Sequence, residues 1–278
     1  MIERGAESYR RQSLPERLAT MLPAGAGVAA LRQRLRPVFT RLLSSGTRLV
    51  ATLPDGERVI LAAAHRHVTW NPHEYRAFRT AVHPGSIVFD VGANAGAYTM
   101  LFAQWVGPAG HVYAFEPDGR AFEGLTTHLR LNRVADWTTA SSAAVLDRPG
   151  PASLVVSDSP GGSRVVPGLR IDDTGRRVQA VSIDHVCRER GVVPNVIKID
   201  VEGAELSVLR GARETIAAAG DRVTLFVEMH PRLWPEAGHG LRDVQIECER
   251  LELEPQSICS GNRWGSEGVC VMLRRKPR

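Results

Sequence analysis

The chain has 278 residues, of which 43% are hydrophobic and 23% charged, so it can bury a core of ordinary size. This composition excludes wholesale disorder. The formal net charge of +5 would suit a nucleic-acid partner, but the arginines are scattered and no basic stretch alternates with aromatic residues. We therefore expect no nucleic-acid binding.

Cysteine usage and the N-terminal stretch bear on the cellular compartment. The four cysteines form no C-x-x-C pair and adjoin no histidine cluster, so we predict free, mostly buried thiols and no zinc site. The stretch MIERGAESYRRQSLPERLAT lacks the apolar segment of a secretory signal, and no run approaches the ~20 apolar residues of a membrane helix. We expect a soluble, cytoplasmic protein without a membrane partner.

Residues 1–83 are predicted to form an N-terminal extension. Apolar residues at helical spacing predict an amphipathic helix over 26–43. The stretch TRLVATLPDGERVILAA predicts a β-hairpin around its Pro-Asp-Gly turn. NPHEYRAFRTAV predicts a short helix with Asn71 as its N-cap. We expect this extension to serve substrate recognition or dimerisation, and a homodimer stays open.

Residues 84–278 are predicted to form one α/β domain. Strand-like apolar runs alternate with helical stretches, the pattern of a doubly wound, mostly parallel sheet. Two final strands, EPQSICS and GVCVMLRR, predict a closing antiparallel strand, and we expect seven strands in all. The predicted elements include strands at 87–91, 112–115, 138–145, 196–199 and 223–227, and helices from about 95 and over 119–131, 204–212 and 241–251.

One insertion, Ser157–Arg177, interrupts this alternation. It is rich in Gly, Pro, Ser and Asp and follows a predicted strand over 152–156. It is either a surface loop or a lid over a site, and we favour the lid because such loops lie near the carboxyl ends of the strands.

The stretch VFDVGANAGAYT places small residues directly after the strand 87–91. Gly92 and Gly96 are expected to remove Cβ atoms that would keep a ligand away from the turn. Asn94 occupies the second glycine position of a G-x-G-x-x-G pattern, and no Gly-Lys-Ser/Thr follows, so neither a pyrophosphate nor a P-loop ligand is favoured. Asp90 before the loop suits a positively charged ligand instead.

The next strand ends in VYAFEP, which places Glu116 at the same sheet edge. A carboxylate there can accept hydrogen bonds from both ribose hydroxyls of a nucleoside. An acidic loop and a ribose-binding Glu without a phosphate cradle fit S-adenosylmethionine. The alternative is a tight turn in which Asp90 caps the helix and Glu116 is solvated.

A second cluster of polar residues lies in NVIKIDVEGAELSVLRGA and VTLFVEMH. Alternation along a strand puts Lys198, Asp200 and Glu202 on one face, and Glu228 and His230 share a face on the later strand. Lys198 is one of only two lysines in the chain. We expect both strands to bring these groups to the edge where the glycine loop lies.

Three roles for this second cluster are open. His230 has the ordinary pKa of a general base, and Asp200 or Glu228 could accept the proton or orient the base. Asp200 and Glu228 could instead hold Mg²⁺ with waters. The third possibility is a purely structural role. Trp234, in HPRLWPEAGHG, either walls an acceptor pocket or simply packs in the core.

These motifs together resemble the FkbM-type S-adenosylmethionine-dependent methyltransferases. VFDVGANAGAYT and IKIDVEGAELSVLRGA, with VYAFEP and VSIDHV between them, carry the similarity over roughly residues 84–230. The resemblance implies a class I methyltransferase (Rossmann-like) fold and methyl transfer, mostly to oxygen, in secondary-metabolite biosynthesis on polyketides, sugars or other small acceptors.

The resemblance also implies roles for individual residues. Asp200 and Glu202 would line the reaction centre. The implied cofactor-binding residues are Asp90, Gly92, Asn94, Gly96, Tyr98, Thr99, Glu116, Ser142 and Ala143. Competing functions are N-methylation, a nicotinamide-dependent oxidoreductase, and a cofactor-binding scaffold without turnover.

Overall fold

The computed structural model describes residues 48–157, 162–167, 175–258 and 265–275. The helix predicted over 26–43 and Cys259 lie outside these ranges. Cys187, Cys248 and Cys270 are buried free thiols, as predicted. None of the helices in the described ranges has the length and apolar character needed to cross a bilayer.

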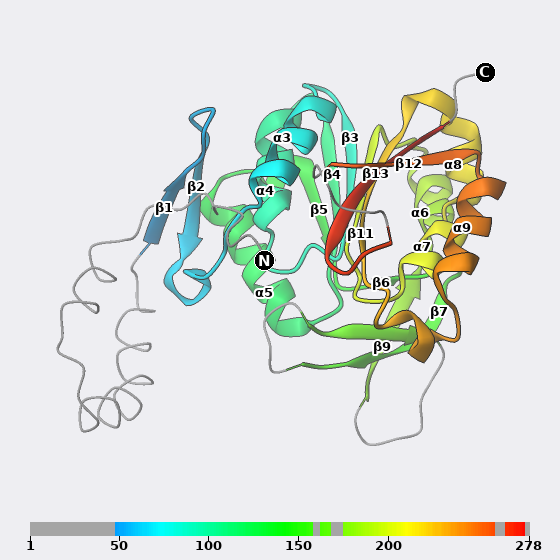
Figure 1. Ribbon diagram of the computed structural model, residues 1–278. Helices are drawn as coiled ribbons and strands as arrows, with labels where there is room; N and C mark the ends of the chain where they lie inside the picture. The colour runs from blue at the N-terminus through cyan, green and yellow to red at the C-terminus, as the bar shows by residue number, and fades with distance from the viewer. Residues whose placement is uncertain (1–47, 158–161, 168–174, 259–264, 276–278) are drawn as a thin grey trace, which may run out of the picture.

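The centre of the molecule is a mostly parallel sheet, which confirms the predicted α/β class (Figure 1). Only β13 runs antiparallel among its seven strands, because it pairs antiparallel with both β11 and β12. From one edge to the other, the strands are β5 (Thr138–Ser141), β4 (His111–Phe115), β3 (Ile87–Val91), β10 (Val196–Ile199), β11 (Thr224–Met229), β13 (Val269–Arg275) and β12 (Leu253–Ser257).

Helices cover both faces of this sheet, and each face has its own hydrophobic core (Figure 1). Alternate strand residues serve the two cores: Ile197 and Ile199 belong to one, and Val196 belongs to the other. One face carries α3 (Pro72–Ala81), α4 (Ala97–Val106) and α5 (Gly119–Leu131); the other carries α6 (Ile183–Arg190), α7 (Glu205–Arg210), α8 (Arg213–Ala219) and α9 (Leu241–Arg250).

A second, four-stranded sheet corrects two predictions. The segment predicted as one strand over 138–145 breaks after Ser141, so that its last two residues join the second sheet. The insertion predicted as a loop also contributes strands to it. In sheet order the strands are β6 (Ala144–Val145), β9 (Gly175–Val181), β7 (Gly150–Val155) and β8 (Arg164–Pro167).

The predicted hairpin consists of β1 (Arg48–Thr52) and β2 (Arg58–Ala62), and α5 holds its second strand. His128 of α5 accepts a hydrogen bond from the Ala62 amide at Nε2 (3.0 Å), and its Nδ1 lies 2.7 Å from the Ala95 carbonyl oxygen. An amide can only donate and a carbonyl can only accept, so His128 is neutral with its proton on Nδ1. The hairpin is thereby joined to the glycine loop through one buried ring.

We predict that His128→Phe destabilises the fold, because the Ala62 amide and the Ala95 carbonyl both lose their partner. The expected loss is about 2 kcal/mol near neutral pH. Burial lowers the pKa of His128 below its ordinary value of 6.5, so its contribution is complete above that value. The contribution decreases as the pH falls towards the pKa of the folded state.

Urea unfolding of the wild type and the variant at about pH 8 and about pH 5 measures this difference. The stability gap should be wider at the higher pH. His83→Ala, at an exposed position, serves as the control and should show no such pH-dependent gap. A gap that stays constant or widens on acidification would contradict the assignment of a neutral His128.

Candidate functional site

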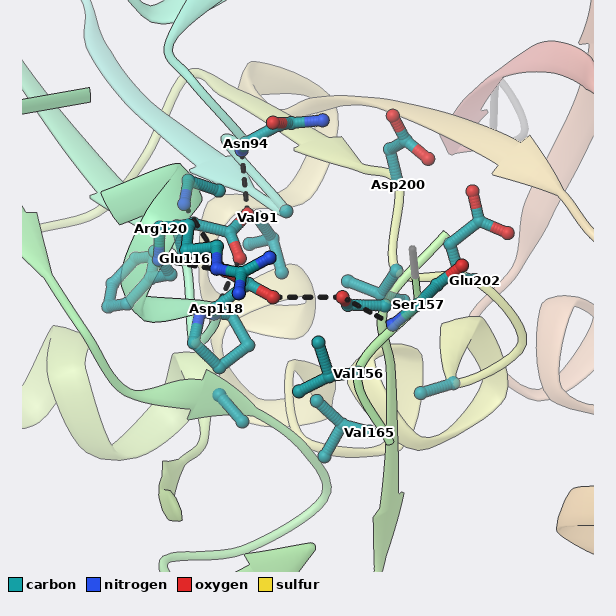
Figure 2. A pocket seen from close by; sticks show the side chains of 18 of the residues that line it. Val91, Asn94, Glu116, Asp118, Arg120, Val156, Ser157, Val165, Asp200 and Glu202 are labelled. Atoms are coloured by element: carbon teal, nitrogen blue, oxygen red, sulfur yellow. Dashed lines mark hydrogen bonds between the residues drawn. The ribbon is translucent and has the colours of Figure 1, made fainter. Parts of the chain in front are cut away.

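A cavity of ≈ 390 Å³ opens where β3, β4, β10 and β11 end. This edge includes the point between β3 and β10 where the strand order reverses, which is where doubly wound sheets bind ligands. Figure 2 shows Asn94, Glu116 and Asp118 on one side of it, and Asp200 and Glu202 on the other. Its lining also includes His65, His67, Gly92, Arg120, Val156, Ser157, Ser163, Val165 and Glu228.

Gly92 and Gly96 are required by packing between elements, a reason that the sequence did not indicate. A Cβ on Gly92 would lie 1.7 Å from the carbonyl oxygen of Asp200, and one on Gly96 would lie 2.7 Å from the Leu125 side chain. Both residues also have positive φ angles. The glycines therefore let β10 and α5 approach the loop, and only Gly92 of the two lines the cavity.

Asn94 and Glu116 are tied together at the end of β4. The Asn94 amide donates to Glu116 Oε2 at 2.7 Å, and the Asp118 amide donates to Oε1 at 2.8 Å. Burial raises the pKa of Glu116 to about 7, against the effect of these two hydrogen bonds. The carboxylate is thus fixed in place, and its remaining lone pairs are available to a ligand in the cavity.

Asp90 lies behind the loop rather than on the cavity surface. Its side chain is 1% exposed, and Oδ2 accepts a 2.5 Å hydrogen bond from the Thr99 hydroxyl. Oδ1 lies 3.6 Å from Lys198 Nζ. The strand register explains this pairing, because Lys198 lies directly beside Asp90 in the parallel β3–β10 pair. Asp90 therefore does not line the cavity, contrary to the sequence-based expectation of a carboxylate facing the ligand.

The other predicted cofactor residues also lie outside the cavity lining. Thr99 is fully buried against Asp90, and the Tyr98 hydroxyl donates to Glu74 Oε2 at 2.5 Å. Ser142 and Ala143 do not line the cavity. The next two residues along the chain, Ala144 and Val145, line it instead. These two residues begin the second sheet, which the sequence did not reveal.

Three carboxylates face the cavity, as expected: Asp200, Glu202 and Glu228 all line it. Only Glu228 lies on a strand, whereas Asp200 and Glu202 follow the end of β10 and Glu202 lies in a turn instead of on the predicted strand face. The Asp200 carboxylate lies 3.3 Å from Lys198 Nζ. Burial raises the pKa of Glu228 to about 8, and the charges of Asp200 and Glu74 add to this effect. Glu228 therefore titrates slightly above neutral pH at the cavity wall, and the fraction that is ionised at neutral pH can act as a general base.

His230 is buried beside these carboxylates and is not among the lining residues. Its Nδ1 lies 2.7 Å from Glu205 Oε1. Burial alone would lower the pKa of His230, but the hydrogen bond to Glu205 and the surrounding carboxylates raise it to about 9. Such a ring is protonated at neutral pH and cannot accept a proton, so the expectation of His230 as general base is not favoured.

Sequence reasoning missed Glu205. It is fully buried and accepts hydrogen bonds from the Gly203 amide and from Trp234 Nε1, in addition to its contact with His230. The available signal was the position of Glu205 in the stretch GAELSVL. Its spacing from the apolar residues of that stretch places it on the core face of a helix. The bond to Trp234 also decides that this tryptophan packs in the core and does not wall the pocket.

The insertion contributes one wall of the cavity through Ser157, Ser163 and Val165, next to Val156, which directly precedes it. The Ser163 hydroxyl donates to Asp118 Oδ2 at 2.9 Å and accepts from the Ser157 amide at 3.2 Å. Since Asp118 also caps α5 with its other oxygen, the insertion is fastened to the ribose side of the predicted site. Its described residues form part of the site, in line with the predicted lid position.

Comparison with known proteins gives this fold and site a class. A family model described as the methyltransferase FkbM domain matches residues 90–249, more than half of the chain. The chain therefore belongs to the FkbM methyltransferase family, as its motifs suggested.

The chain is also similar to individual proteins. The chain is 32% identical to 31-O-demethyl-FK506 methyltransferase FkbM of Streptomyces tacrolimicus over 161 residues, which is 47% of this chain and 61% of that protein. Among solved structures, a SAM-dependent O-methyltransferase from Thermotoga maritima is 13% identical, with a TM-score of 0.43 and coverage of 86% of this chain and 81% of that one. Fibrillarin from Aeropyrum pernix is also 13% identical, with a TM-score of 0.44 and coverage of 81% and 92%.

We predict that Gly92→Ala is severely destabilising, because the new Cβ would overlap the Asp200 carbonyl and force the end of β10 away. The expected loss is roughly 3 kcal/mol or more. Gly238→Ala is a matched control: Gly238 has nearly the same φ (+77° against +76°) but no atom within 4 Å of the added Cβ.

Gly238→Ala should cost about 1–2 kcal/mol, the cost of the left-handed backbone alone. Urea unfolding of both variants measures the difference. Equal losses in the two variants would show that close approach of β10 is not what requires glycine at position 92.

Proposed function

We propose that the protein transfers the methyl group of S-adenosylmethionine to a hydroxyl oxygen of a small molecule. The observation that carries this proposal is the hydrogen bonding of the glycine loop. All five backbone amides from 92 to 96 already have partners: two donate to the Phe115 carbonyl, one to Glu116, one to the Asn94 side chain and one to the Ala93 carbonyl.

A loop without free amides cannot cradle a phosphate group. Dinucleotide-binding turns offer loop amides as well as the amides at the start of the following helix to a pyrophosphate, whereas here the loop amides from 92 to 96 donate to the protein itself. The carboxylates around the cavity would also repel a phosphate. A nucleoside whose reactive group is a positively charged sulfur fits this site, and a nicotinamide cofactor does not.

Glu116 would hold the ribose and thereby orient the nucleoside across the cavity. Its two oxygens are fixed by the amides of Asn94 and Asp118, so each keeps one direction open towards the cavity for a ribose hydroxyl. The acid cluster on the opposite side then faces the sulfonium end, where its negative charge favours the cofactor.

S-adenosylmethionine supplies an activated methyl group, so the protein must position the acceptor and accept one proton. The acceptor oxygen forms a bond to the methyl carbon while the carbon–sulfur bond breaks and the hydroxyl proton leaves. Glu228 is the proposed base, with Asp200 oriented beside it by Lys198. The positive charge of protonated His230 would favour the ionised form of Glu228, since its Nε2 lies 3.8 Å from Glu228 Oε1.

The acceptor is proposed to be a small natural product, a polyketide or a sugar. Val156 and Val165 give the insertion side of the cavity an apolar surface, while Ser157 and Ser163 add hydroxyl groups. The relative from Streptomyces tacrolimicus is named for methylation at an oxygen of FK506, which supports an oxygen acceptor here. The chain spans only 61% of that relative, so the acceptors of the two proteins need not be the same.

We predict that Glu228→Gln and Glu116→Gln impair different steps. Glu228→Gln should lower turnover by roughly 100-fold or more, the typical contribution of a general base, and leave the affinity for S-adenosylhomocysteine within a few-fold. Glu116→Gln should weaken that affinity by at least about tenfold, because it removes a charged acceptor from the ribose. Glu254→Gln, at an exposed position on β12, is the control.

Calorimetry with S-adenosylhomocysteine measures affinity. Turnover is followed by mass spectrometry of metabolites from cells with and without each variant, as the gain of one methyl group by an acceptor. Tight NADH binding without binding of S-adenosylhomocysteine would overturn the proposal in favour of an oxidoreductase. Cofactor binding with no methylated product from the wild-type protein would favour a scaffold.

A further inference from the structure

The ring of His230 presents one nitrogen to the acid cluster without a hydrogen bond to any residue that the structure describes. The side chain is 7% exposed. Its Nε2 lies 3.7 Å from Glu202 Oε1 and 3.8 Å from Glu228 Oε1. Both distances are too long for hydrogen bonds. The distance between Nε2 and Glu202 Oε1 suits two ligand atoms that each lie about 2.0–2.2 Å from one shared ion.

Glu205 orients this nitrogen towards the cluster. Its carboxylate is fully buried, receives Nδ1 of His230 at 2.7 Å, and is itself held by Trp234 Nε1 and by the Gly203 amide. A histidine that binds a metal almost always donates its other ring N–H to such a carboxylate. Because Glu205 already has three donors, it serves as the support of the ring and not as a ligand.

Asp200 completes a set of three ligands. One oxygen each of Asp200 and Glu202 and one nitrogen of His230 lie within 4.8 Å of one another. Asp200 can serve because the hydrogen bond from Lys198 goes to its Oδ2, at 3.3 Å, and a carboxylate has further lone pairs for an ion. This set differs from the Asp200–Glu228 pair predicted from the sequence, since the structure adds an imidazole.

We propose that Asp200, Glu202 and His230 bind one divalent cation of the kind that accepts imidazole together with carboxylates, such as Mn²⁺, Fe²⁺, Co²⁺ or Zn²⁺, and that Nε2 of His230 releases its proton to solvent when the cation binds. Mg²⁺ is disfavoured, because it prefers an all-oxygen shell. Two of the ligands face the cavity, so such a cation has open positions for water or for a hydroxyl.

The role of the cation in turnover rests on the proposed function, whereas its binding does not. A cation at this site would hold the acceptor oxygen beside Glu228 and make its proton easier to remove. The cation carries no redox step, and the atoms exchanged in methyl transfer stay the same.

Titration of the full-length protein with Mn²⁺ tests the site without any need for turnover. The protein is first dialysed against a chelator, and bound Mn²⁺ is then measured by the loss of the electron paramagnetic resonance signal of the free ion. We expect one bound ion per chain and displacement of Mn²⁺ by Zn²⁺. We also expect Mg²⁺ to bind at least about tenfold more weakly than Mn²⁺.

Variants distinguish the proposed ligands from the general negative charge. Glu202→Gln and His230→Gln should each weaken Mn²⁺ binding by at least about tenfold, and Glu205→Gln should weaken it by about 10–100-fold as loss of the supporting residue. The controls Glu254→Gln and His83→Ala, both at exposed positions, should bind Mn²⁺ like the wild type.

Calorimetry with S-adenosylhomocysteine shows whether each variant is folded. If His230→Gln does not fold, then Glu202→Gln, whose side chain is 28% exposed, decides the question. Wild-type protein that binds S-adenosylhomocysteine but no Mn²⁺ overturns the cation site and leaves the proposed function intact. Equal Mn²⁺ affinity in the wild type and in the folded ligand variants overturns it as well. Mn²⁺ binding without cofactor binding overturns the proposed function alone.

Discussion

The buried ion pair network around Lys198 is the interaction on which the rest of the site depends. Lys198 Nζ lies between Asp90 of β3 and Asp200 at the end of β10, so it joins the strand before the glycine loop to the strand before the acid cluster. Burial alone would lower the pKa of Lys198, but Asp200 and Asp90 outweigh burial and raise it above its ordinary value. The lysine is therefore charged, and its loss would leave the buried carboxylate of Asp90 without compensation beside the partly exposed Asp200, a strongly destabilising arrangement.

The same junction explains why the glycine loop has its particular composition. Gly92 lies against the Asp200 carbonyl, where a side chain would not fit. Asn94 has a left-handed backbone conformation, and its side-chain oxygen accepts a hydrogen bond from the next backbone amide. The backbone amide of Asn94 donates to Glu116 at the end of β4. The backbone amides of the loop therefore donate to the protein itself, and the carboxylate of Glu116 lines the cavity beside the loop. In the proposed function, this arrangement selects a nucleoside through its sugar and its positive charge, and not through phosphate.

Much of this architecture could be predicted from local patterns. The strands at 87–91 and 196–199 and the helix over 119–131 have the predicted bounds, because apolar alternation and an Asp118 cap are local signals. The positions of Glu116, Asp200 and Glu228 at one edge follow from the parallel sheet alone. These residues line the cavity as the pattern indicated.

The remainder depends on contacts between distant segments. The steric need for Gly92 comes from Asp200, more than a hundred positions later, and the burial of Asp90 comes from Lys198 on a neighbouring strand. The charge of His230 is decided by Glu205, which belongs to another element. The second sheet likewise joins β6, β7, β8 and β9 around an insertion whose composition indicated only a loop. No pattern along the chain reports such neighbours.

A crystal structure of the protein with S-adenosylhomocysteine tests the central claim most directly. The account predicts that both ribose hydroxyls contact the Glu116 carboxylate and that the sulfur points across the cavity towards Asp200 and Glu228. Adenosine bound elsewhere, or a sulfur turned away from those carboxylates, would contradict it.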